Sequence, residues 1–146
     1  MNEEQLLKSG ERINQLFSTD IKIIQNREVF SYSVDSVLLS RFPRFPKNGL
    51  IVDFCAGNGA VGLFASSRTK AKILSVEIQE RLADMAERSV RLNGLEEQMQ
   101  VICDDLKNMP SHIQGSKVDL ILCNPPYFKV DANSNLNESE HYLLAR

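Results

Sequence analysis

The sequence has few of the residues that build metal sites and disulfides, and it has no long apolar run. Its 146 residues include three cysteines and two histidines; no two cysteines form a CxxC pair, and neither histidine has an evident partner. A zinc site or a disulfide framework is therefore not expected. No apolar stretch reaches the roughly 18 residues of a membrane span, and the acidic N-terminus lacks the features of a signal peptide. These absences predict a cytoplasmic protein that binds neither a metal nor a membrane.

An excess of one charge is also missing. The 17 lysine and arginine residues stand against 19 aspartate and glutamate residues, which gives a formal net charge of −2. Binding nucleic acid over a large surface needs a basic patch, so this balance argues mildly against one. Arg41, Arg44 and Lys47 form a short basic cluster among phenylalanines and prolines. Such clusters are usually solvated loops, and we interpret this one in that way.

What is present is the composition of one globular domain, with 42% hydrophobic and 25% charged residues. Helices are predicted over 60–68 and 79–92, the second strongly amphipathic and followed by an Asn-Gly stop signal. Four apolar runs are typical of strands buried on both faces, at residues 50–54, 72–78, 99–103 and 118–123. This alternation predicts an α/β fold with a parallel sheet built from right-handed strand-helix-strand units.

The N-terminal 48 residues are predicted to form a separate helix and hairpin segment, ahead of a core over 49–146. Residues 1–20 are expected to be partly helical. Short strands are expected at 21–24 and 29–32, around a turn at 25–27. A helix over 33–41 follows, with an apolar stripe at helical spacing made by Val34, Val37, Leu38 and Phe42.

The turn after the first core strand has the composition of a nucleotide-binding loop. Gly57, Gly59 and Gly62 follow a GxGxxG pattern between a strand and a helix, and the first two let a ligand approach the main chain. Glu77 ends the next strand, where a carboxylate can bind a ribose diol. In a dinucleotide enzyme such a turn binds a pyrophosphate. In a methyltransferase it holds the amino-acid end of S-adenosylmethionine.

Acidic residues at the strand ends favour the second ligand. Asp53, at the tip of the first core strand, would repel a pyrophosphate but could lie near the cationic amine of a methionine moiety. Asp104 and Asp105 follow the third strand, where a carboxylate could bind an adenine amine, and we assign that role to Asp105. Because parallel strands end at one edge, Asp53, Glu77 and Asp105 predict a site for a nucleoside-bearing cofactor there.

The most specific motif is Asn124-Pro125-Pro126-Tyr127, directly after the fourth strand. Its prolines fix φ and remove two backbone donors, so a rigid rim presents the Asn124 amide and the Pro125 carbonyl. A flat amine-bearing substrate could donate its two N–H groups to these acceptors. Tyr127 could stack on the substrate's face, at about 1–3 kcal/mol per base. A base would have to leave its helical stack, or come from a single-stranded loop, to reach this rim.

With these residues the chain resembles class I methyltransferases that act on amino groups. That group includes adenine methyltransferases of DNA and RNA, guanine methyltransferases of ribosomal RNA and glutamine methyltransferases of release factors. Residues 10–13, 23–25 and 29–39 narrow the resemblance to bacterial tRNA adenine-N6 methyltransferases, which modify the adenine beside the anticodon of a valine tRNA. The resemblance covers the chain from about residue 9 onward.

The resemblance implies a Rossmann-like fold, which is a parallel sheet with helices on both faces. It also implies S-adenosylmethionine as methyl donor and an RNA partner, tRNA first. It implies that Glu77 binds the ribose and that Asp105 binds the cofactor adenine. Residues 30–35 would form a lid over the cofactor. The methionine end would be surrounded by Asp53, Ala56, Gly57 and Gly59. The target base would be held by Asn124, Pro125, Pro126 and Tyr127, with Asn124 also bordering the cofactor.

The resemblance also implies a seven-stranded sheet, of which this chain supplies four strands. We therefore expect the later strands to be missing, and the open apolar edge to leave these 146 residues poorly soluble and little active. Oligomeric state stays open.

Other functions stay open at this point. An NAD-type oxidoreductase would explain the glycines and Glu77, but not the Asn-Pro-Pro-Tyr motif. A non-catalytic RNA-binding module would keep the fold without needing the acidic residues. Within methyltransferases, a protein glutamine competes with adenine because its amide also carries an NH2 group. A guanine target and a DNA target also stay open, because both are inferred from the same four residues, 124–127.

Overall fold

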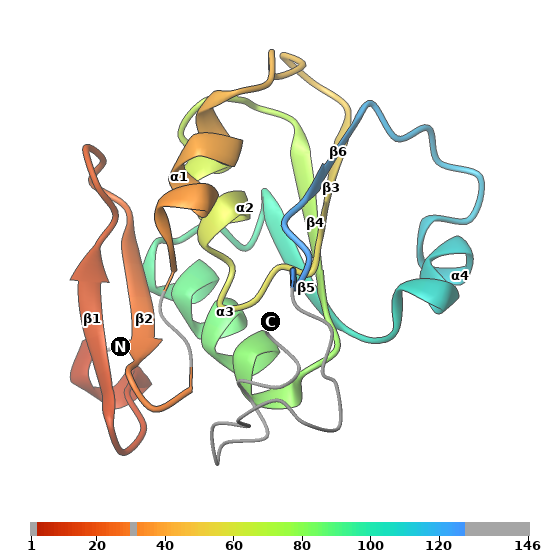
Figure 1. The fold of residues 1–146 in the computed structure, drawn as a ribbon. Coiled ribbons are helices and arrows are strands. Elements are labelled where there is room, and N and C mark those ends of the chain that lie inside the picture. Colours follow the sequence, from red (N-terminus) through yellow and green to blue (C-terminus); the bar gives the residue numbers. More distant parts are fainter. Residues whose placement is uncertain (1–2, 30–31, 128–146) are drawn as a thin grey trace.

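A sheet of four parallel strands forms the centre of the protein (Figure 1), whose computed structural model describes residues 3–29 and 32–127. The strand order is β5-β4-β3-β6, and every neighbouring pair is parallel. Right-handed crossovers through helices are the usual way to connect such strands. The predicted parallel α/β architecture is confirmed, with strands β3 (Leu50–Phe54), β4 (Lys72–Glu77), β5 (Met99–Cys103) and β6 (Leu120–Cys123).

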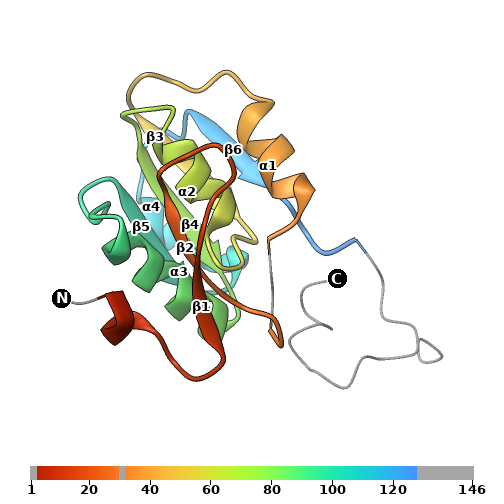
Figure 2. The same cartoon turned by 90° about the vertical axis from the view of Figure 1, so that its left-hand side faces the viewer.

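Helices cover the two faces of this sheet unequally (Figures 1 and 2). Ile51 packs into the cluster beneath α2 (Ala60–Ser66), whereas its neighbour Val52 packs with Met109 on the other face. This alternation is the period of two that strand geometry imposes. The helix α3 (Glu80–Leu92) lies on the α2 side, and the short η2 (Leu106–Asn108) and α4 (Met109–Ile113) lie on the Met109 side. No helix in the described part of the chain is long and apolar enough to cross a membrane.

The described part of the N-terminal segment is mainly a hairpin, with one short helical turn at its start. After the short η1 (Glu3–Leu6), β1 (Glu11–Gln15) pairs antiparallel with β2 (Lys22–Asn26). The predicted helix was wrong over β1 because its hydrogen-bond partner lies beyond a turn, which local spacing does not reveal. The predicted turn at 25–27 was also placed too early, since β2 runs through Asn26. Val29 lies in the following turn rather than in a strand.

The helix α1 (Val34–Arg41) is confirmed, but most of its apolar stripe faces outward. Val34, Leu38 and Phe42 are 71%, 60% and 90% exposed, whereas Ser36 and Ser40 are buried. The Ser40 hydroxyl donates to the Val37 carbonyl at 2.7 Å, so its burial leaves no unpaired donor. Small side chains let α1 lie close to α2.

The strand β6 forms one edge of the described sheet. Among the described strands it pairs only with β3, and its Ile121 is 55% exposed. An open apolar edge is what the sequence predicts. The division at residue 48 stays a prediction.

Candidate cofactor and substrate site

The loops that leave the carboxyl ends of β3, β4 and β6 meet the start of α1 around a cavity of about 220 Å³. Parallel α/β sheets bind ligands at this edge. A second cavity of about 190 Å³ adjoins it and shares Cys55, Glu77 and Pro126 with the first. The first cavity is lined by Ser33, Asp35, Ser36, Cys55, Ala56, Gly57, Asn58, Ala60, Val61, Glu77, Gln79, Leu82, Asn124, Pro125, Pro126 and Tyr127.

The turn between β3 and α2 owes its shape to three residues with positive φ. Cys55, Gly57 and Gly59 have φ of 55°, 56° and 85°, a region that favours glycine. A Cβ at Gly59 would also lie 3.0 Å from the Cβ of Ala86. The turn is closed by the Ala56 N–H, which donates to the Val76 carbonyl at 3.0 Å. Of the predicted turn residues, Ala56 and Gly57 line the cavity, whereas Gly59 does not and instead caps the start of α2.

Glu77 connects the ends of β3 and β4. Its Oε2 accepts a hydrogen bond from the Gly57 N–H at 2.7 Å, and its Oε1 accepts one from the Gln79 N–H at 2.8 Å. The side chain is buried and lines both cavities. Each carboxylate oxygen can accept a further bond, so Glu77 can orient the turn and still bind a ligand diol.

Asp53 does not line either cavity. It sits opposite Ser75 in the β3–β4 register and is buried. Within residues 3–29 and 32–127, neither of its carboxylate oxygens has a partner of good hydrogen-bond geometry. Burial raises the pKa of Asp53 to about 7, an effect that the nearby Gly62 N–H and Ser75 hydroxyl only partly offset. The structure thus separates Asp53 from the ligand-facing side of Glu77. Its contact with a methionine amine stays a prediction.

Asp105 lines the second cavity, as predicted for the end of β5. Its carboxylate accepts a hydrogen bond from the Lys107 N–H at 3.0 Å and so caps η2. Asp104 is held by Asn108 and His112, each at 2.7 Å. The hydrogen bond from His112 is the main reason that the pKa of Asp104 is lowered. The expectation that His112 has no partner was therefore wrong.

The Asn-Pro-Pro-Tyr motif borders the first cavity together with the glycine turn, because β6 ends beside β3. Asn124 Oδ1 accepts a hydrogen bond from the hydroxyl of Tyr127, whose side chain is 62% exposed. An amine entering the cavity would compete with that hydroxyl for the same oxygen. Partial burial raises the pKa of Tyr127, and the charge of Asp35 adds to the effect. All four predicted substrate residues line one wall.

Several lining residues were not singled out from the sequence. Ser33 and Asp35 lie in the predicted lid over 30–35 and do face the cavity, whereas 30–31 lie outside the described residues. Asn58 is fully buried and donates from Nδ2 to the carbonyl of Ile24 in β2 at 3.3 Å. Its Oδ1 has no hydrogen-bond partner in the part of the chain that the structure describes. The sequence signal for Asn58 was its place inside the glycine motif. Its hydrogen bond to Ile24 links the hairpin to the turn.

The fold is that of Rossmann-like methyltransferases. The SAM-dependent methyltransferase from Agrobacterium tumefaciens superposes with a TM-score of 0.62 at 20% identity, over 82% of this chain and 41% of that one. The human methyltransferase 10 domain containing protein gives a TM-score of 0.62 at 16% identity, over 76% and 56% of the two chains. These identities show a shared fold.

Residues 36–145 match the family described as Conserved hypothetical protein 95, and the chain belongs to that family. Its curated relatives include a tRNA1(Val) (adenine(37)-N6)-methyltransferase from Shewanella halifaxensis, 32% identical over 96 residues, which are 66% of this chain and 39% of the relative. One from Bacteroides fragilis is 29% identical over 94 residues, or 64% and 40% of the two chains. The resemblance predicted from the sequence is confirmed. The chain spans about two-fifths of these relatives' length.

Proposed function

We propose that the protein transfers a methyl group from S-adenosylmethionine to the N6 amine of an adenine in tRNA. The observation that carries the proposal is that residues 124–127 and the Glu77-bound glycine turn line the same cavity. The names of the curated relatives support the same reaction and substrate.

The described residues fit S-adenosylmethionine. Two adjoining cavities joined at Glu77 match a ligand with an amino-acid end and a nucleoside end. Glu77 would accept hydrogen bonds from the ribose hydroxyls, and Asp105 would accept one from the adenine amine. The turn at Ala56 and Gly57 would hold the methionine end. When bound, the cofactor supplies a methyl group on a positively charged sulfur.

The chain's own contribution to the reaction is positioning. Asn124 Oδ1 and the Pro125 carbonyl would accept the two N–H groups of the target amine and direct its lone pair into the cavity. Holding both reactants in one geometry removes much of the entropic barrier. These hydrogen bonds strengthen as positive charge develops on the nitrogen. No strong general base is required, because the methylated nitrogen is acidic until it loses a proton.

The test is methyl transfer from labelled S-adenosylmethionine, with the whole protein and bulk tRNA from a strain that lacks its gene. Label recovered as N6-methyladenosine in one tRNA supports the proposal. Cofactor binding without label in tRNA would refute tRNA as the substrate. Ribosomal RNA, DNA and release-factor glutamine would then be tested in turn. Calorimetric binding of NAD(H) in place of S-adenosylmethionine would overturn the whole assignment.

A further inference from the structure

Positive charge is concentrated in one part of the chain. Residues 36–76 carry six lysines and arginines against a single acidic residue, Asp53, which is buried. The whole chain nevertheless has a net charge of −2, so the remainder is strongly acidic. One of the six cations, Lys72, donates to the carbonyl of Glu97. The other five, which we call the basic face, are Arg41, Arg44, Lys47, Arg68 and Lys70.

Tertiary structure joins two separate segments into this face. The turn after α2 is hydrogen-bonded to the loop after α1, from the Lys70 N–H to the Lys47 carbonyl at 3.2 Å and from the Thr69 hydroxyl to the Pro46 carbonyl at 2.5 Å. The Arg68 guanidinium lies 5.4 Å from the centre of the Phe45 ring. An open hollow of about 540 Å³ between the segments is lined by Lys47, Asn48, Ser66, Ser67, Arg68, Thr69 and Lys70, with no carboxylate among them.

The cations of the basic face have no acidic partners. All five are exposed, and none forms an ion pair with a carboxylate among residues 3–29 and 32–127. Elsewhere the protein pairs its surface lysines, as in Lys8 with Asp84 and Lys22 with Glu3. Unpaired like charges attract polyanions and raise their rate of encounter.

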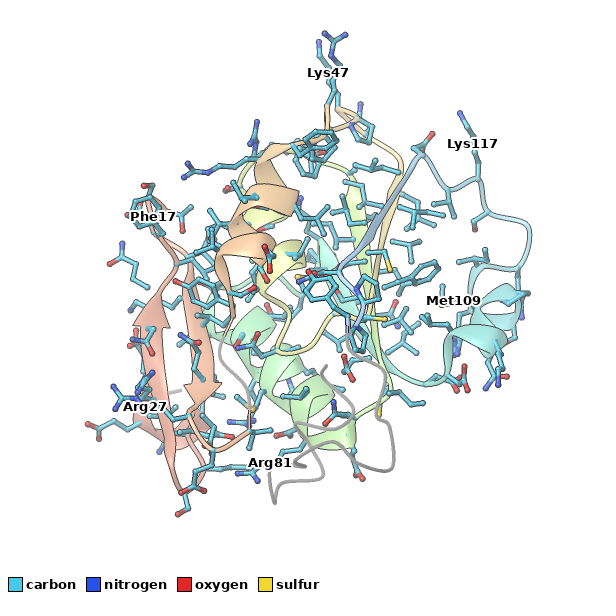
Figure 3. The ribbon with its side chains drawn as sticks, viewed as in Figure 1. Phe17, Arg27, Lys47, Arg81, Met109 and Lys117 are labelled. Atoms are coloured by element: carbon cyan, nitrogen blue, oxygen red, sulfur yellow. The ribbon has the colours of Figure 1, made fainter. Side chains whose placement is uncertain are left out.

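The basic face lies at the opposite end of the sheet from the candidate site. Lys47 projects from the end of the molecule where β3 begins (Figure 3), whereas the cavity lies where β3 ends. Five strand residues at about 3.3 Å each separate the two by about 17 Å. A single partner that reaches both must therefore be extended, and an extended polyanion could contact the cations while inserting one group into the cavity.

We propose that the basic face binds the sugar-phosphate backbone of the RNA whose base enters the cavity. The inference rests on the proposed RNA substrate and adds the surface that holds it. RNA is favoured over an anionic membrane because the hollow is concave and lined by amide and hydroxyl groups as well as by cations. Phosphate contacts position a nucleic acid without reading its sequence, and Arg41, stacked 5.8 Å from the Phe17 ring centre, extends the face toward the hairpin.

The test compares two triple variants of the whole protein with equal changes in net charge. The first is Arg44→Gln, Lys47→Gln and Lys70→Gln, whose side chains make no hydrogen bond or ion pair with described residues. The control is Lys8→Gln, Lys22→Gln and Arg91→Gln, which removes three ion-paired cations. For each, the Kd for bulk tRNA is measured against salt concentration, with the Kd for S-adenosylmethionine as a check on folding.

We expect the first variant to bind tRNA about tenfold more weakly and to lose about 2 from the slope of log K against log salt, since each phosphate contact contributes about 0.7–0.9. Its KM for tRNA should rise while its kcat and its cofactor Kd stay unchanged. Equal losses of tRNA affinity in both variants, or no loss in the first, would overturn the proposal that the basic face binds RNA. Loss of binding to phosphatidylserine vesicles with tRNA binding intact would replace RNA with a membrane. Failure of methyl transfer in the wild type would instead refute the proposed function.

Discussion

Replacing Glu77 with glutamine tests whether its carboxylate organises the cofactor site. Both oxygens of Glu77 now accept backbone N–H groups, from Gly57 at 2.7 Å and from Gln79 at 2.8 Å. The amide of glutamine offers one acceptor oxygen, so one of these buried donors would face an NH2 group. A hydrogen bond to a charged group contributes about 1.5–3 kcal/mol, and an unsatisfied buried donor is costly.

Because the lost bond holds the glycine turn, we expect the Glu77→Gln variant to bind S-adenosylmethionine about tenfold to about a hundredfold more weakly. Isothermal titration calorimetry, well below the unfolding temperature, measures this loss. Glu77→Asp keeps the charge but shortens the side chain, and it serves as the control for geometry. Wild-type affinity in the Glu77→Gln variant would refute the role given to this carboxylate in both the turn and the ligand site.

Three further changes test other parts of the structure. Asn124→Ala should lower the single-turnover rate of methyl transfer far more than cofactor affinity; a collapse of cofactor binding with an unchanged chemical step would contradict its place at the target amine. The folded-state pKa of Asp53 is raised from 3.8 to about 7, so the folded protein binds more protons than the unfolded chain between these values, and stability falls as pH rises from about 4 to about 7. Asp53→Asn should remove that loss and stabilise the protein at pH 8 by on the order of 3–4 kcal/mol. Urea unfolding of both proteins at pH 5 and pH 8 measures this effect. The same pH dependence in both proteins would refute the burial argument. Arg88 forms an ion pair with the buried carboxylate of Glu11 at 2.5 Å. Arg88→Ala should cost about 3–5 kcal/mol of unfolding free energy, because it leaves that carboxylate buried without its partner; a double-mutant cycle with Glu11→Ala that shows no coupling would contradict a stabilising role for the pair.

Much of the site follows from strand ends that are visible in the sequence. Buried parallel strands are continuous apolar runs, so the ends of β3, β4 and β6 could be placed without coordinates. The placement of Ala56, Gly57, Glu77 and residues 124–127 around one cavity then follows, because parallel strands end at a common edge. Asp105 was placed beside that edge for the same reason.

The direction of Asp53 could not be predicted in this way. Successive strand residues point to opposite faces, and Asp53 shares the face of Ile51, beneath α2. The acidic residue at a strand tip can therefore be buried under the neighbouring helix instead of facing a ligand. Which face carries the helix is decided by packing, and no local pattern records it.

By itself, the sequence determined the parallel α/β class, the turn between β3 and α2, and the rigid rim at 124–127. Each of these depends on neighbouring residues along the chain: hydrophobic continuity, glycine at positive φ, and proline at a strand end. Only the tertiary structure decided the hairpin, the outward apolar stripe of α1 and the basic face. These arise when segments distant in sequence are hydrogen-bonded together, as β1 with β2 and Lys70 with Lys47, and the free energy of such pairing is not contained in either segment alone.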